Sequence, residues 1–229
     1  MASLDARIIS IGTLSAHPLW EESTPVRTGH ATCTLVTAGD VRMIVNPGLP
    51  SQAMAARLSE RSPVKHTDIT HVFVTTFTAD HYRGILAFEQ ATWLVHEPEM
   101  QSAGEALRHQ FEAARDTGDP ETEKLARTHL DVLERCKDAP DKIAPGIDLF
   151  PLPGVSPGTC GILLPMPVQT VLLSGDAVAT CEHAEQGKVL PGCVDVETAM
   201  ESFKEAVEIA DLIVPGRDNL MTNPARRGF

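Results

Sequence analysis

Apolar residues along the chain fall into short runs separated by polar turns, and most of these runs predict strands. Runs rich in β-branched residues predict strands at 7–12, 31–37 and 41–46, and Gly39-Asp40 between the last two predicts a hairpin turn. Further short runs predict strands at 71–75, 92–96, 147–152, 161–164, 170–173 and 212–214. The predicted strands come in two groups, one in each half of the chain.

Between these strands the apolar positions change to a helical period. Ser51 is the expected N-cap of a helix over 52–61, and Asp119-Pro120 is expected to open the second helix of a charged region over 97–138. A further helix is expected after Asp195, where apolar residues recur on one face at Val196, Ala199, Met200, Phe203, Ala206, Val207 and Ala210. The alternation of strands and helices predicts an α/β fold.

Composition narrows the class of protein. A chain of 229 residues can bury one substantial core, so we expect a single domain over 1–229. Its net charge of −12 repels phosphate backbones, so nucleic acid is not an expected partner. No apolar run reaches the roughly 18 residues of a membrane span, the first seven residues lack a signal-peptide core, and the five cysteines form no Cys-x-x-Cys pair. We therefore expect a cytoplasmic protein with reduced thiols and no membrane partner.

Five short motifs follow apolar runs, in the order Asn46-Pro47-Gly48, Thr75-Thr76-Phe77-Thr78-Ala79-Asp80-His81, Pro153-Gly154-Val155-Ser156-Pro157-Gly158, Ser174-Gly175-Asp176 and Pro215-Gly216-Arg217-Asp218. In this order they resemble the metallo-β-lactamase superfamily. Its corresponding motifs read Asp-x-Gly, Thr-His-x-His-x-Asp-His, Pro-Gly-His-Thr-Pro-Gly, Gly-Asp and Pro-Gly-His-Gly. The resemblance implies a four-layered αββα sandwich, with a helical insertion at about 97–138 and a cleft along the edge where the loops meet.

The resemblance also implies a two-metal site, from which this chain departs. Thr76, Thr78 and Val155 stand where the first metal would have three histidines. Zinc prefers imidazole, thiolate and carboxylate ligands, so two hydroxyls and a valine are poor replacements. We expect this first metal position to be lost.

The second metal position is partly retained. Asp80, His81 and the bridging Asp176 are present, but Arg217 replaces the last histidine and a guanidinium cannot ligate a metal. Asn46 stands where a supporting carboxylate is usual, which removes a further negative charge. These residues could hold at most one zinc, iron or manganese ion, and no cofactor is expected.

Two functions remain open from the sequence. The first is a non-hydrolytic pseudoenzyme that binds a small molecule or a partner in a cleft formed by Thr76, Thr78, Tyr82, Val155, Arg217 and Asn46. The alternative is a mononuclear metal hydrolase of an ester, lactone or thioester, with Asp80 as the candidate catalytic residue and a metal on Asp80, His81 and Asp176. His183 could be an additional ligand in that case. Either function is compatible with a homo-oligomer.

Arg217 suggests how the site could stay folded without metal. Two close, buried carboxylates need a counter-charge, and a guanidinium can donate to both. We therefore expect Arg217 to lie at the metal position between Asp80 and Asp176. The other arrangements open to it are exposure to solvent and a pair with Asp218.

Overall fold

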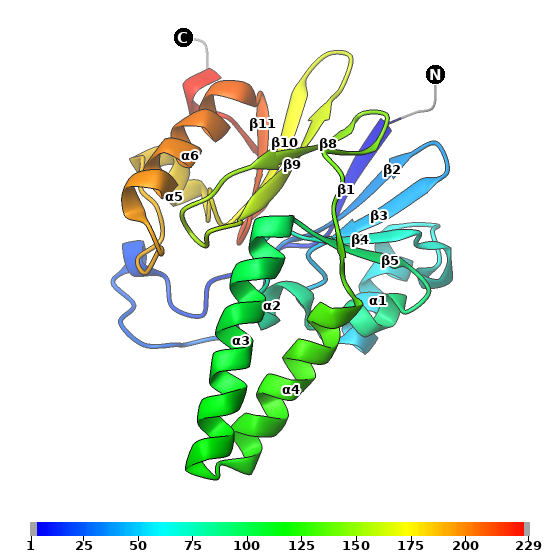
Figure 1. Cartoon of the computed structure of the whole chain (residues 1–229). Helices are drawn as coiled ribbons and strands as arrows, with labels where there is room; N and C mark the ends of the chain where they lie inside the picture. Colours follow the sequence, from blue (N-terminus) through cyan, green and yellow to red (C-terminus); the bar gives the residue numbers. More distant parts are fainter. Residues whose placement is uncertain (1–3, 227–229) are drawn as a thin grey trace.

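The computed structural model describes residues 4–226 and is built around two six-stranded sheets (Figure 1). The first sheet runs in the order β1-β2-β3-β4-β5-β6, with β3, β4 and β5 parallel to one another. Its strands are β1 (Leu4–Ser10), β2 (Cys33–Ala38), β3 (Val41–Val45), β4 (His71–Val74), β5 (Thr92–Val95) and β6 (Lys137–Asp138).

The second sheet runs in the order β12-β11-β10-β9-β8-β7, and only β10 and β11 are parallel neighbours among its described strands. Its strands are β7 (Lys142–Ala144), β8 (Ile147–Pro151), β9 (Cys160–Pro165), β10 (Thr170–Gly175), β11 (Leu212–Pro215) and β12 (Met221–Thr222). The predicted strands are all present with shifted ends, whereas β6, β7 and β12 are too short to give a sequence signal.

Alternating side chains divide the interior into three apolar layers. Phe73 of β4 and Leu173 of β10 belong to the core between the two sheets. Val72 of β4 points to the opposite face of its sheet, and Leu172 of β10 does the same in the second sheet. Both sheets are therefore covered on both faces, and the predicted αββα sandwich is confirmed.

Helices form the two outer layers. They are α1 (Ser51–Arg61), α2 (Ala79–Tyr82), α3 (Glu97–Thr117), α4 (Pro120–Arg135), α5 (Cys181–Gln186) and α6 (Val196–Ile209), with 3-10 turns η1 (Pro18–Trp20), η2 (His66–Asp68), η3 (Ile85–Phe88) and η4 (Pro224–Arg226). Asp119 and Asp195 cap α4 and α6 as predicted, each accepting from backbone N–H groups. The predicted Ser51 cap is wrong: Ser51 is the first helical residue, and Pro50 stands at the N-cap without a side-chain hydrogen bond.

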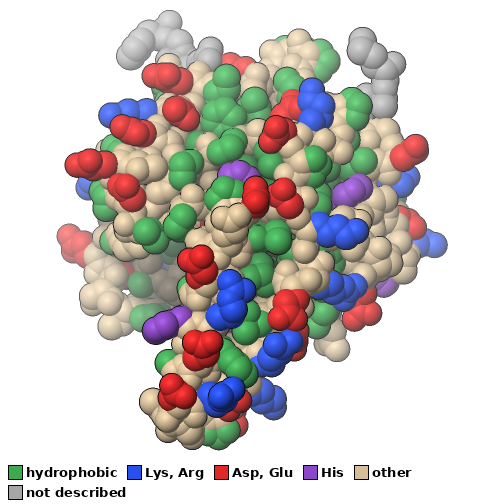
Figure 2. All heavy atoms as spheres, viewed as in Figure 1, with side chains coloured by type: hydrophobic (Ala, Val, Ile, Leu, Met, Phe, Trp, Pro, Cys, Tyr) green, Lys and Arg blue, Asp and Glu red, His purple; other side chains and the backbone are tan. Residues whose placement is uncertain are grey.

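The charged region forms an antiparallel hairpin of α3 and α4 that projects away from the sheets (Figure 1). Gly118, with φ of 68°, ends α3 in the left-handed conformation that glycine adopts without steric cost. Figure 2 shows both acidic and basic side chains along this hairpin. No helix within residues 4–226 is long and apolar enough to cross a membrane.

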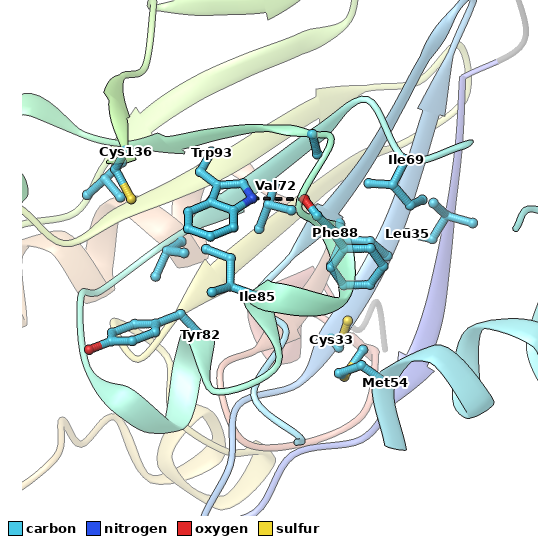
Figure 3. Packing of buried hydrophobic residues seen from close by; sticks show 14 of the residues in the cluster. Cys33, Leu35, Met54, Ile69, Val72, Tyr82, Ile85, Phe88, Trp93 and Cys136 are labelled. Atoms are coloured by element: carbon cyan, nitrogen blue, oxygen red, sulfur yellow. Dashed lines mark hydrogen bonds between the residues drawn. The ribbon is translucent and has the colours of Figure 1, made fainter. Parts of the chain in front are cut away.

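The outer face of the first sheet packs tightly beneath α2 and η3. Figure 3 shows Trp93 and Phe88 in this cluster, with Trp93 Nε1 donating a hydrogen bond of 3.0 Å to the Phe88 carbonyl. Ile85 and Tyr82 belong to the same cluster and are at most 5% exposed. This packing fixes the loop that follows β4, which carries the candidate site.

Candidate functional site

The candidate site lies where strands of both sheets end at one edge of the sandwich. Asn46 follows β3, and the segment from Thr75 follows the parallel strand β4. Asp176 follows β10, and Arg217 lies two residues beyond β11, which is parallel to β10. A backbone hydrogen bond from Cys160 N to Thr75 O, 3.0 Å long, joins the two sheets here. Segments that are more than 100 residues apart in sequence therefore meet at this edge.

Two glycines permit this close approach. A Cβ on Gly216 would lie 2.4 Å from Asp176 Oδ1, and a Cβ on Gly175 would lie 2.6 Å from Thr75 Oγ1. Gly175 also has φ of 55°, a conformation that side chains disfavour. Gly216 thus leaves room for the Asp176 carboxylate, and Gly175 lets the end of β10 lie against Thr75.

Arg217 binds both carboxylates of the site. Its Nε donates to Asp176 Oδ1 at 2.8 Å, its Nη2 donates to Asp176 Oδ2 at 2.7 Å, and its Nη1 donates to Asp80 Oδ2. Arg217 is 8% exposed and Asp176 is 5% exposed. The predicted position of the guanidinium, between Asp80 and Asp176, agrees with this geometry. We call Arg217, Asp80, Asp176 and His81 the Arg217 cluster.

Within this cluster, His81 is the member with no exposed surface. Its Nδ1 is 2.7 Å from Thr78 Oγ1, which also donates to Asp80 Oδ1 at 2.7 Å. Its Nε2 is 3.6 Å from Asp176 Oδ2 and makes no hydrogen bond within the described residues. The Thr78 hydroxyl, in the place of a histidine, thus orients both Asp80 and His81.

Opposing effects set the ionisation of the cluster. Burial raises the pKa of Asp176, but the charges of Arg217 and His81 outweigh it and hold the pKa below its usual range. The pKa of Asp80 is lowered despite burial, through its hydrogen bond with His81 and the charge of Arg217. The pKa of Arg217 is raised because Asp176 and Asp80 outweigh its burial. Both carboxylates and the guanidinium therefore remain charged at any ordinary pH.

A separate network of hydroxyl groups joins Thr76 to the loop after β8. Thr76 Oγ1 lies 3.2 Å from Thr159 Oγ1, which lies 2.6 Å from Ser156 Oγ. Ser156 Oγ donates to Glu99 Oε2 at 2.5 Å, and Phe77 N donates to Glu99 Oε1 at 2.7 Å. This network satisfies buried polar atoms close to the position where the superfamily motif would place imidazoles.

These residues open onto a cleft of about 590 Å³ between α3 and the loops. Six of the residues singled out from the sequence line it together: Thr76, Thr78, Asp80, Val155, Asp176 and Arg217. The motifs thus form one surface, although their residues span most of the chain.

Four other residues singled out from the sequence lie outside this lining, and one of them is His81, which is fully buried behind it. Tyr82 stacks on Phe77 with ring centroids 4.4 Å apart and lies in the buried cluster of Figure 3, because it is on the opposite face of α2 from Asp80. Asn46 lies behind the cleft with φ of 54°, where its Oδ1 accepts from Thr75 N at 2.9 Å. His183 is fully buried on α5, with Nδ1 2.9 Å from Thr180 Oγ1.

Sequence reasoning missed the wall that α3 contributes. Glu99, Ser102, Ala103 and Ala106 line the cleft, and Glu99 is only 3% exposed. A glutamate in the first turn of a charged helix indicates a favourable interaction with the helix dipole and a solvated face. Nothing in that pattern signals a buried carboxylate that binds two loops.

The comparisons with known proteins agree with this architecture. A family model described as the metallo-beta-lactamase superfamily matches residues 26–217. The chain belongs to the metallo-β-lactamase superfamily. No curated protein sequence matches it.

Solved structures of superfamily hydrolases share the fold at low identity. AiiA from B. thuringiensis, in a mutant form with N-decanoyl-L-homoserine bound, is 21% identical over 95% of this chain and 94% of its own, with a TM-score of 0.66. The hydrolase AbOPH is 15% identical over 99% and 95%, with a TM-score of 0.68. The dizinc lactonase AidC is 14% identical over 84% and 74%, with a TM-score of 0.67. At these identities the likeness shows the fold alone.

The donor set does not fit the two-metal site that the superfamily motifs describe. Thr76, Thr78 and Val155 offer no nitrogen, and the side-chain oxygens of Asp176 face the guanidinium of Arg217. Among residues 4–226, no three His, Cys, Asp or Glu side chains are grouped so that they could hold a metal ion. A metal at this position would first have to displace an internal cation.

Proposed function

We propose that this member of the superfamily binds a small molecule in its cleft and does not catalyse metal-dependent hydrolysis. The observation that carries the proposal is the Arg217 guanidinium, which donates to both Asp80 and Asp176. These are the carboxylates that would face a metal ion according to the superfamily motifs. A permanent cation on the chain offsets one of their two negative charges and donates hydrogen bonds to both, without any cofactor.

Metal binding would work against this arrangement. A dication at Asp80 and Asp176 would have to expel the Arg217 side chain, which is bidentate to Asp176 and 8% exposed. It would then have Asp80, Asp176 and one imidazole as its protein ligands in place of the full set of the superfamily. Both effects lower metal affinity, and they support a site that works without metal.

The cleft itself supports retained binding. Its volume of about 590 Å³ lies within the range of small-molecule sites, and apolar side chains form much of its wall. The hydroxyls of Thr76, Thr78 and Ser156 provide polar contacts within that wall.

One observation favours the alternative, a mononuclear metal hydrolase. His81 Nε2 is buried without a hydrogen bond in the described part of the chain and lies 3.6 Å from Asp176 Oδ2. An unpartnered imidazole nitrogen beside a carboxylate is a candidate ligand pair. The alternative requires that Arg217 rotate out of the cluster.

Assays of hydrolysis separate the two functions. We expect negligible turnover of β-lactam, lactone and thioester substrates, both with added zinc, iron or manganese and with a chelator, while a superfamily lactonase serves as the positive control. Metal-dependent turnover that disappears on chelation and in the His81→Ala variant would contradict the proposal and support the mononuclear hydrolase.

A further inference from the structure

The cleft carries an excess of negative charge. Its charged lining residues are the carboxylates of Asp80, Glu99 and Asp176 and the single guanidinium of Arg217, a formal charge of −2. His81 lies behind the wall and adds at most one positive charge. The cleft is therefore negative in either protonation state of His81, and the chain as a whole carries −12.

Glu99 is the cleft carboxylate that Arg217 does not contact. Arg217 binds Asp80 and Asp176, whereas Glu99 accepts its two hydrogen bonds from the Phe77 backbone N–H and the Ser156 hydroxyl. Neither donor carries a formal charge, and Glu99 is 3% exposed. Its negative charge is therefore held at the cleft wall by neutral partners.

The remaining wall is apolar and suits a hydrocarbon group. The apolar lining residues are Phe77, Ala103, Ala106, Val155, Pro157 and Val194. Phe77 adds little to this wall, because it is only 7% exposed and its ring stacks on Tyr82 in the buried core. A ligand that matches this surface has a positive head and an apolar tail.

We propose that the cleft binds an organic cation, which is a molecule with an ammonium group and an apolar tail, and that it excludes carboxylates. This inference rests on the binding function proposed above. The selectivity of the cleft is opposite to that of a two-metal cleft, where positive metal ions attract anionic groups. Glu99 is the residue that determines the preference, because Arg217 binds the other two carboxylates of the cleft and does not contact Glu99.

A ligand series with one tail and three head groups tests this selectivity. Calorimetric titration at pH 7 and low salt compares octylamine, which is a cation at this pH, with octanol and octanoate. We expect octylamine to bind about tenfold more tightly than octanol, and octanoate to bind most weakly. The advantage of octylamine over octanol shrinks as salt is raised, because screening weakens only the charged ligand.

Paired variants locate the source of the preference. Glu99→Gln keeps the shape of the side chain and should lower the affinity for octylamine several-fold while that for octanol stays unchanged. Glu97→Gln is the control, since Glu97 is exposed on the same helix and lies outside the cleft lining. If Glu99→Gln does not fold, Ala106→Lys places a cation on the exposed cleft wall and should remove octylamine binding, whereas Ala113→Lys further along α3 should not.

The outcomes separate this inference from the function on which it rests. Equal affinity for the three ligands, tighter binding of octanoate, or no binding of octylamine would overturn the inference about the ligand. An unchanged preference in both Glu99→Gln and Ala106→Lys would also overturn it. The proposed function fails by a different result, which is metal-dependent turnover in the hydrolysis assays.

Discussion

Replacing Arg217 with methionine should leave two carboxylates in the Arg217 cluster without their counter-charge. Methionine keeps an unbranched apolar stem but removes the three hydrogen bonds to Asp176 and Asp80. Asp176 is only 5% exposed, so water cannot replace these donors, whereas the side chain of Asp80 is 30% exposed and is partly hydrated. Breaking a buried ion pair from one side costs about 3–5 kcal/mol, which for a chain of this size lowers Tm by roughly 10 °C.

The matched control is Arg127→Met. Arg127 also binds two carboxylates, Asp131 at 2.6 Å and Glu134 at 3.0 Å, but its side chain is 50% exposed. Water screens exposed pairs of this kind, so this variant should be nearly as stable as the parent. Urea denaturation at pH 7 measures both free energies of unfolding. Losses of equal size in the two variants would refute the reasoning, and so would an Arg217→Met, Asp176→Asn double variant that recovers none of the lost stability.

The pH dependence gives a second check on the same perturbation. In the parent, the pKa values of Asp80 and Asp176 are lowered on folding, so ionisation of these two carboxyls stabilises the folded state at pH values above their ordinary pKa of about 4. This stabilisation is lost as the pH falls below about 4. In the variant, burial without the guanidinium raises the pKa of at least one carboxyl, so stability is lost as the pH rises above about 4. The stability gap should be widest near neutral pH and narrow toward pH 4. A gap that stays constant over this range would count against the ion-pair explanation.

Two further predictions concern residues next to the cleft. Burial, followed by the charge of His17, lowers the pKa of His183 to about 4. The stability of the folded state that depends on a neutral His183 is therefore fully present above about pH 6.5, and roughly 3 kcal/mol of it is lost as the pH falls toward 4. Denaturation between pH 7 and pH 4 should show a smaller loss in His183→Asn, and equal slopes in the two proteins would contradict this. Asn46→Ala should cost about 1 kcal/mol more than Asn46→Gly, because Asn46 has φ of 54°, and both should lose a further ~1–3 kcal/mol through the unpaired Thr75 N–H. Thermal unfolding of the two variants checks the difference, and a glycine variant no more stable than the alanine variant would show that strain is not involved.

The strand framework could be predicted because its signal is local. The apolar run before Thr75 predicts a buried strand, and β4 ends at Val74 with its residues alternating between two cores. The caps Asp119 and Asp195 were predictable for the same reason, since a cap acts on the next three residues. The Ser51 cap was wrong because Pro50 already takes the N-cap conformation, with ψ of 149°.

The candidate site was less predictable because its contacts come from distant segments. The position of Arg217 followed from two carboxylates that needed a cation, a requirement that the motifs themselves express. The direction of Tyr82 did not follow, since its neighbour His81 gives no information on which face of the four-residue helix α2 points into the cleft. Glu99 was missed because its partners, Phe77 and Ser156, are 22 and 57 residues away.

The most direct test of the central claim is elemental analysis of the parent and of Arg217→His. Both proteins are produced in cells grown with added zinc and are purified in buffers that contain no metal. We predict well under one zinc, iron or manganese per chain in the parent. The variant should carry more zinc than the parent and, once stripped by a chelator, should be less stable than the parent. Two tightly held metal ions in the parent would contradict the account. It would equally fail if the Arg217→His variant bound zinc no better than the parent and was no less stable without it.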